Sequence, residues 1–111
     1  MALYVPRKGD FITLTFDPRS GREQKGRRPA LVISNDQFNR ETGLAVVCPI
    51  TNTDRGIPFH IRIRDTAVLT GLIMVDQVKS VAFASRKAKF IDRAPSALLA
   101  EALAVLDAVI Y

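Results

Sequence analysis

The chain has 111 residues, 48% of them hydrophobic and 24% charged, and a formal net charge of +5. This length suits a single domain over residues 1–111, and the globular composition argues against disorder. No apolar run reaches the ~20 residues that a membrane-spanning helix requires, and Pro6 interrupts the N-terminus before a signal sequence could form. We therefore expect a cytoplasmic protein with no membrane partner.

The positive charge lies mainly in the first part of the chain. Sixteen Lys and Arg oppose eleven Asp and Glu, and the sequence pI is about 9.9. Residues 1–28 hold seven cations and three anions, whereas residues 94–111 hold two anions and no cation. A basic protein with this distribution favours a partner that carries phosphates, or an acidic peptide that imitates them.

The first half of the sequence predicts three strands. Residues 11–16 alternate apolar and Thr side chains, which is typical of a half-buried strand. Residues 30–34 are apolar and β-branched, which indicates a more buried strand, and the polar residues 35–43 favour one helical turn. Residues 44–50 form the third predicted strand, in which Pro49 indicates an edge or a bulge.

The second half predicts further short strands and a terminal helix. After a loop over residues 52–58, alternation gives the following strands, at residues 59–64, 72–75, 78–83 and 86–91. Pro95 suits the first position of a helix that ends at Ile110, and this helix carries an apolar stripe of Leu99, Ala102, Leu103, Leu106 and Ile110. We expect the helix to pack against the sheet and against another subunit. Six or seven strands and one terminal helix predict a mainly β protein, built as a small, strongly bent antiparallel sheet or barrel.

A densely functionalised loop separates the first two predicted strands. Between Asp17-Pro18 and the second strand, two glycines alternate with cations, a carboxylate and an amide, namely Arg22, Glu23, Gln24, Lys25, Arg27 and Arg28. Loops on a rigid scaffold often carry binding and catalysis, and this set suits a site that handles phosphate. The alternative is a solvated basic hairpin loop.

The residue counts argue against a metal-dependent hydrolase, a dinucleotide-binding site and a His-based catalytic triad. The chain has one His and one Cys, no phosphate-binding Gly-Lys-Ser/Thr loop and no cluster at metal-ligand spacing. Cys48, in an apolar strand, is interpreted as a small buried hydrophobe rather than a nucleophile. His60 alternates with Arg62 and Arg64, and is interpreted as a surface residue of a basic strand rather than an acid–base catalyst. We expect neither a metal nor a cofactor.

The sequence is still compatible with RNA cleavage, because RNA supplies its own nucleophile, the 2′-hydroxyl. A protein needs a cation on the phosphate oxygens and groups that take and give a proton. Arg binds phosphate through short, charge-assisted hydrogen bonds. Glu23, Arg28 and the hydroxyl of Thr51 at the end of the third strand meet this specification if they converge.

The order of motifs resembles the MazF (PemK-like) toxin family over essentially the whole chain. The resemblance rests on Lys8-Gly9-Asp10, on the run from Gly21 through Glu23-Gln24 and Arg28-Pro29 to Ser34, on Pro49-Ile50-Thr51, on Gly56-Ile57-Pro58-Phe59, and on Val75-Asp76-Gln77-Val78-Lys79-Ser80. It implies an SH3-like β-barrel with a C-terminal helix. It also implies a homodimeric, metal-independent endoribonuclease that cuts single-stranded RNA at a short sequence, and a cognate antitoxin with an acidic, flexible tail.

The resemblance also assigns roles to single residues. Arg28 and Thr51 match the family's catalytic arginine and threonine, and Glu23 matches a loop glutamate implicated in activity in some members. Positions near the RNA groove correspond to Gln24, Arg27, Asn52, Thr53, Arg55 and Gln77, and Arg22 and Lys25 make this loop more basic than in many relatives. Two other functions stay open at this point: a non-enzymatic toxin of the gyrase-poison type, and a non-catalytic RNA-binding barrel.

Overall fold

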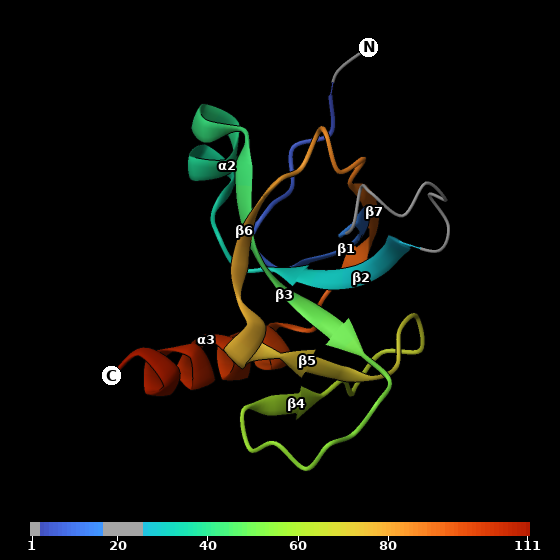
Figure 1. Ribbon diagram of the computed structural model, residues 1–111, viewed down its shortest axis with the longest axis vertical. Coiled ribbons are helices and arrows are strands. Elements are labelled where there is room, and N and C mark those ends of the chain that lie inside the picture. The colour runs from blue at the N-terminus through green and yellow to red at the C-terminus, as the bar shows by residue number, and fades with distance from the viewer. Residues whose placement is uncertain (1–2, 17–25) are drawn as a thin grey trace.

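Most of the fold is a single antiparallel sheet. The computed structural model describes residues 3–16 and 26–111. The strands are β1 (Asp10–Thr15), β2 (Arg27–Val32), β3 (Leu44–Thr51), β4 (His60–Arg62), β5 (Leu72–Met74), β6 (Lys79–Ala82) and β7 (Lys89–Arg93), shown in Figure 1. The helices are α2 (Asp36–Thr42), the 3-10 turn η2 (Val75–Gln77) and α3 (Ser96–Ile110).

The long strand β3 organises the sheet. The strand order is β4-β5-β3-β2-β1-β7, and β6 also pairs with β3. The start of β3 pairs with β6, and its last two residues, Ile50 and Thr51, pair with β5. Within the described residues the two end strands, β4 and β7, do not pair with each other, so the sheet is strongly bent but not closed. This arrangement confirms the mainly β class with a C-terminal helix.

The sequence indicated an edge or a bulge at Pro49, but Pro49 does not lie on an edge strand, and the register between β2 and β3 has no shift there. It lies opposite Ala30 of β2, in the middle of a strand with neighbours on both sides. The β6 partners of β3 end at Val47 and the β5 partners begin at Ile50. Pro49 therefore sits where β3 changes neighbours, a position at which its missing N–H deprives no ladder of a hydrogen bond.

The sheet is buried on both faces around β1, so the prediction of a half-buried first strand was wrong. Phe11 packs with Leu31, Ile73 and Leu98 in one cluster, while Ile12 belongs to the cluster on the other face. Helix α3 supplies the cover for the first cluster, and the curled sheet with the N-terminal segment covers the second. Alternation identifies the two faces of a strand, but the cover over each face depends on distant parts of the chain.

Helix α3 follows the predicted span closely, and its predicted apolar stripe contacts the core except at its last residue. Pro95 occupies the N-cap and the helix begins at Ser96. Leu98 and Ala102 are buried, and Leu99, Leu103 and Leu106 of the predicted stripe pack against the core, whereas Ile110 is 63% exposed and does not belong to it. Among the described residues, no helix combines the length and apolar character that crossing a membrane requires.

Candidate active site

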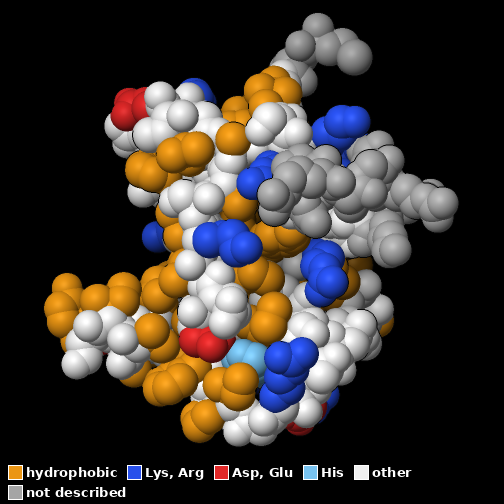
Figure 2. Space-filling view, viewed as in Figure 1, with side chains coloured by type: hydrophobic (Ala, Val, Ile, Leu, Met, Phe, Trp, Pro, Cys, Tyr) orange, Lys and Arg blue, Asp and Glu red, His pale blue; other side chains and the backbone are white. Residues whose placement is uncertain are grey.

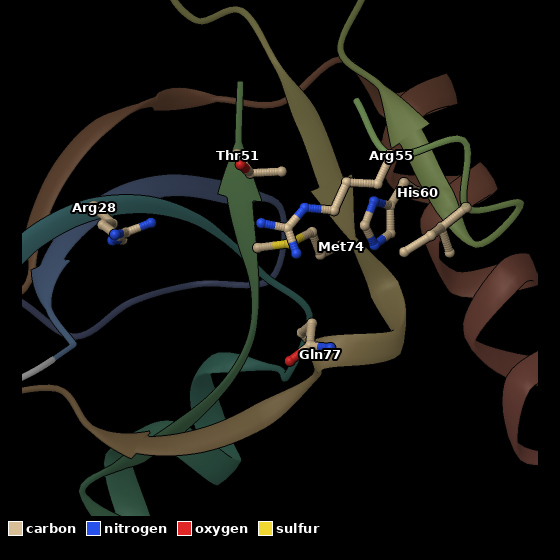
Figure 3. A pocket seen from close by; sticks show the side chains of 7 residues that line it. Arg28, Thr51, Arg55, His60, Met74 and Gln77 are labelled. Atoms are coloured by element: carbon tan, nitrogen blue, oxygen red, sulfur yellow. The ribbon is translucent and has the colours of Figure 1, made fainter. Parts of the chain in front are cut away.

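A pocket of about 250 Å³ opens between β2, the end of β3, the loop that follows it, and β5 with η2. Figure 3 shows Arg28 at one end, Arg55 and His60 at the other, and Thr51 and Met74 between them. The pocket is lined by Arg28, Thr51, Arg55, Ile57, His60, Met74 and Gln77. Figure 2 shows basic side chains spread over the same face of the molecule, so the surface around the pocket suits an anionic ligand.

Strand pairing explains why Arg28 and Thr51 meet. Ala30 lies opposite Pro49 in the antiparallel pair of β2 and β3. Continuing that register by two residues on each strand brings Arg28 opposite Thr51 on the same face. Both residues line the pocket, as the sequence required for a shared phosphate site. The Thr51 Oγ1 accepts a hydrogen bond from the backbone N–H of Thr53 at 3.1 Å, so its own proton is free to point to a ligand.

Arg27 points to the other face of β2 from Arg28. Its Nη2 donates to Thr13 Oγ1 at 2.7 Å, to the Thr13 carbonyl at 3.1 Å and to the Lys87 carbonyl at 2.8 Å. Because successive side chains of a strand point to opposite faces, Arg27 is turned away from the residues that Arg28 approaches. The structure therefore does not bring Arg27 to the pocket; this guanidinium ties β2 to β1 and to the segment before β7.

The loop after β3 carries one predicted residue into the pocket and leaves two outside its lining. Arg55 lines the pocket, whereas Asn52 accepts a hydrogen bond from the Thr70 hydroxyl at 3.5 Å, and Thr53 holds the Thr51 oxygen. Asp54 shapes the turn, because its carboxylate accepts from the Gly56 N–H at 2.9 Å. Gln77 of η2 lines the opposite wall. The predicted residues Arg22, Glu23, Gln24 and Lys25 lie outside the described residues.

His60 is not the surface residue that the sequence suggested. Its side chain is only 4% exposed, and its Nε2 lies 2.9 Å from the Asp76 Oδ1. Alternation along β4 correctly separates His60 from Ile61, but it could not reveal that η2 folds Asp76 against the histidine. Sequence reasoning also missed the apolar pocket residues Ile57 and Met74. His60 of β4 lies opposite Met74 of β5, so these two side chains are within contact range. No local pattern in the sequence predicts this pairing.

Cys48 is an inert buried side chain, as predicted. It is fully buried, and burial, followed by the nearby charge of Asp76, raises the pKa of its thiol to about 12. A thiol with so high a pKa carries almost no thiolate at neutral pH. Among residues 3–16 and 26–111, no three His, Cys, Asp or Glu side chains gather in a way that could hold a metal ion.

Comparison with known proteins places the chain in a family. Residues 7–110 match the family model described as "PemK-like, MazF-like toxin of type II toxin-antitoxin system". The chain is 41% identical over 85 residues to the "Endoribonuclease toxin MazF" of Escherichia coli, an alignment that covers 77% of this chain and 76% of that protein. It is 31% identical over 107 residues to the "Endoribonuclease PemK" of Escherichia coli, with 93% and 80% covered.

Solved structures agree with the sequence relatives. A crystal structure of MazF from Deinococcus radiodurans superposes with a TM-score of 0.85 at 37% identity and covers 96% of this chain and 97% of that one. A crystal structure of MazE-MazF from the same organism gives a TM-score of 0.87 at 36% identity, with the same coverage. The chain therefore belongs to the PemK-like, MazF-like family of toxins of type II toxin–antitoxin systems.

Proposed function

We propose that this toxin is an endoribonuclease that cuts single-stranded RNA at a short sequence, without a metal ion or a ribosome, and leaves a 2′,3′-cyclic phosphate and a 5′-hydroxyl. The endoribonuclease activity follows from the family. The chemistry is supported chiefly by one observation, that Arg28 of β2 and Thr51 of β3 line the same pocket. A guanidinium and a hydroxyl on one wall provide donors for the oxygens of a single phosphodiester.

Arg28 is the proposed electrostatic catalyst. As the 2′-oxygen attacks phosphorus, negative charge grows on the non-bridging phosphate oxygens, and a fixed guanidinium stabilises that charge more than it stabilises the ground state. Arg28 is exposed, and among the described residues its side chain has no hydrogen bond or ion pair that a substrate would have to break. The cation is therefore ready to bind phosphate.

Thr51 is the proposed second donor. Its oxygen already accepts the Thr53 N–H, which leaves the hydroxyl proton for a phosphate oxygen and fixes the direction in which it points. Thr51 is the last residue of β3 and is paired with β5, so this donor is held rigidly. Further along the pocket, Arg55 and Gln77 are the proposed RNA-binding groups, and Glu23, Gln24, Arg22 and Lys25 complete the proposed site from the preceding loop.

The purified protein should cleave a long single-stranded RNA in the presence of EDTA. The expected products carry a 2′,3′-cyclic phosphate on the upstream fragment and a 5′-hydroxyl on the downstream fragment, because the attacking group belongs to the RNA itself. End-group analysis and mapping of the cut sites would check both points. RNA binding without strand scission would favour a non-catalytic RNA-binding protein, and a requirement for a divalent cation would contradict the proposed chemistry.

The same pocket is the proposed target of the antitoxin. An acidic, flexible tail laid across the pocket would occupy the phosphate positions and cover Arg28. The toxin is proposed to act as a cytoplasmic homodimer, and the exposed apolar residues Val109 and Ile110 at the end of α3, with Tyr111 after it, support a contact between subunits.

Antitoxin binding should weaken as salt is added. Charges that pair at a solvent-facing pocket are screened when the Debye length falls from roughly 10 Å to a few Å. Titration of the cognate antitoxin at about 0.1 M and about 1 M salt would measure the change. An affinity that is the same at both ionic strengths would show that apolar contacts, rather than the acidic tail, account for neutralisation.

A further inference from the structure

The contact between the covered His60 side chain and the partly exposed Asp76 carboxylate has no part in the function described so far. The His60 Nε2 lies 2.9 Å from the Asp76 Oδ1, and the His60 Nδ1 is buried with no hydrogen-bond partner among the described residues. Buried polar atoms are almost always paired, so an unpaired ring nitrogen on the wall of a pocket calls for a ligand.

The contact with Asp76 fixes which nitrogen carries the proton. An ionised carboxylate only accepts hydrogen bonds, so the neutral imidazole must hold its proton on Nε2 and donate it to Asp76. The unpaired Nδ1 is then left with its lone pair. His60 is thus prepared to accept a proton or a hydrogen bond at Nδ1, and Asp76 would stabilise the imidazolium that results.

Among the described residues that line the pocket, His60 alone carries a ring nitrogen whose lone pair can accept a proton. The guanidinium groups of Arg28 and Arg55 only donate hydrogen bonds, the Thr51 hydroxyl and the Gln77 amide are not basic, and the other two lining residues, Ile57 and Met74, are apolar. The cleavage requires an acceptor for the proton of the 2′-hydroxyl. We propose that His60 Nδ1 is that acceptor, a catalytic base held by Asp76; this assignment rests on the proposed RNA cleavage.

The proposed step balances without a further reagent. Nδ1 takes the proton of the 2′-hydroxyl while the electron pair of that oxygen forms the new bond to phosphorus. The bond from phosphorus to the 5′-oxygen breaks, and this leaving oxygen takes a proton from water. The imidazolium then returns its proton to solvent. Arg28 and Thr51 hold the phosphate during the transfer, and Asp76 is a positioning residue that does not touch the RNA.

The proposed proton transfer requires that Nδ1 become accessible to the RNA. Nδ1 is covered in the free protein, and Figure 3 shows the Arg55 side chain crossing the pocket beside the His60 ring. Arg55 is an exposed residue on a loop, so a phosphate bound in the pocket would draw its guanidinium toward the phosphate oxygens. The proposal requires this movement to uncover Nδ1 for the ribose of the same nucleotide.

Two variants of similar shape distinguish the roles of the two ring nitrogens of His60. His60→Gln keeps a donor near the position of Nε2 but has no base at Nδ1, and His60→Asn keeps an acceptor near Nδ1 that is not basic. Both should lower kcat by about 10²–10⁴-fold, with KM nearly unchanged. Binding of an RNA with a 2′-deoxy nucleotide at the cleavage position should stay within about twofold of the unmodified protein, because no proton moves in that complex.

Chemical rescue gives a result that a purely structural histidine would not. His60→Ala should regain part of its activity when free imidazole is added, since the small base enters the space left by the ring. Arg64→Gln, an exposed position on the same side of this segment, should keep normal activity with or without imidazole. Asp76→Asn should also lower kcat, because its amide donates to Nε2 and leaves the proton on Nδ1.

The outcomes distinguish this inference from the proposed function. If the unmodified protein cuts RNA and Arg28→Ala does not, but His60→Gln keeps kcat within about threefold, His60 is not the base. Loss of activity in His60→Ala with no imidazole rescue, or with weakened binding of the 2′-deoxy RNA, would likewise overturn the assignment. Failure of the unmodified protein to cut RNA would instead remove the proposed cleavage itself.

Discussion

Replacing Arg28 by alanine should lower kcat for RNA cleavage by about 10³-fold or more and leave the fold unchanged. The loss is large because the guanidinium supplies the charge that opposes the growing negative charge on the phosphate. The fold should survive because Arg28 is exposed and, within the described part of the chain, has no hydrogen bond or ion pair. Steady-state cleavage kinetics and thermal unfolding of the same preparation would measure both effects.

The adjacent arginine provides a matched control for this experiment. Arg27→Ala removes the same side chain from the same strand, but it breaks contacts to Thr13 and Lys87 rather than a contact in the pocket. It should lower Tm by several degrees and leave the chemical step of the folded enzyme intact. Arg28→Lys should be intermediate, because it keeps a charge but loses the bidentate geometry. Full activity of Arg28→Ala would show that this pocket is not the cleavage site.

Much of the strand content could be predicted from local patterns, whereas burial and boundaries could not. Residues 11–16 were expected as a strand and form β1 at Asp10–Thr15. β2 was expected from residue 30 but begins at Arg27, because Arg27 and Arg28 pair with Thr15 and Leu14 of β1. That pairing brings together residues that are distant in sequence, and nothing in the composition of a basic loop indicates it.

The site residues that belong to a sequence motif could be predicted, whereas the residue whose environment depends on tertiary packing could not. Arg28 and Thr51 were expected together and line one pocket. His60 was misjudged because alternation with two arginines suggested an exposed face, while its environment is set by η2, a three-residue turn that carries Asp76. Short 3-10 turns leave little periodic signal in a sequence, so the partner of this histidine appears only in three dimensions.

Changing Gly71 to alanine should damage the fold and the site together. Gly71 has a φ of +124°, which side chains rarely adopt, and a Cβ at this position would lie 2.6 Å from the backbone carbonyl oxygen of Thr51 and 3.0 Å from the Asn52 Oδ1. Backbone strain of this kind costs about 1–3 kcal/mol, and the carbonyl cannot turn aside as a flexible side chain could. We expect Tm to fall by roughly 5–15 °C.

The clash should also lower activity beyond the loss of folded protein, because relief requires Thr51 to move away from Gly71, and a displacement of about 1 Å can cost about 10²-fold in rate. Gly43→Ala is the control: its φ is +72° but no atom lies within 4 Å of the added Cβ, so it adds strain without a clash and lies outside the pocket lining. That variant should lose a little stability and no activity. Equal kcat values for Gly71→Ala and Gly43→Ala, measured well below both unfolding transitions, would mean that cleavage tolerates a displaced Thr51 hydroxyl and that its proposed role as a fixed phosphate donor is wrong.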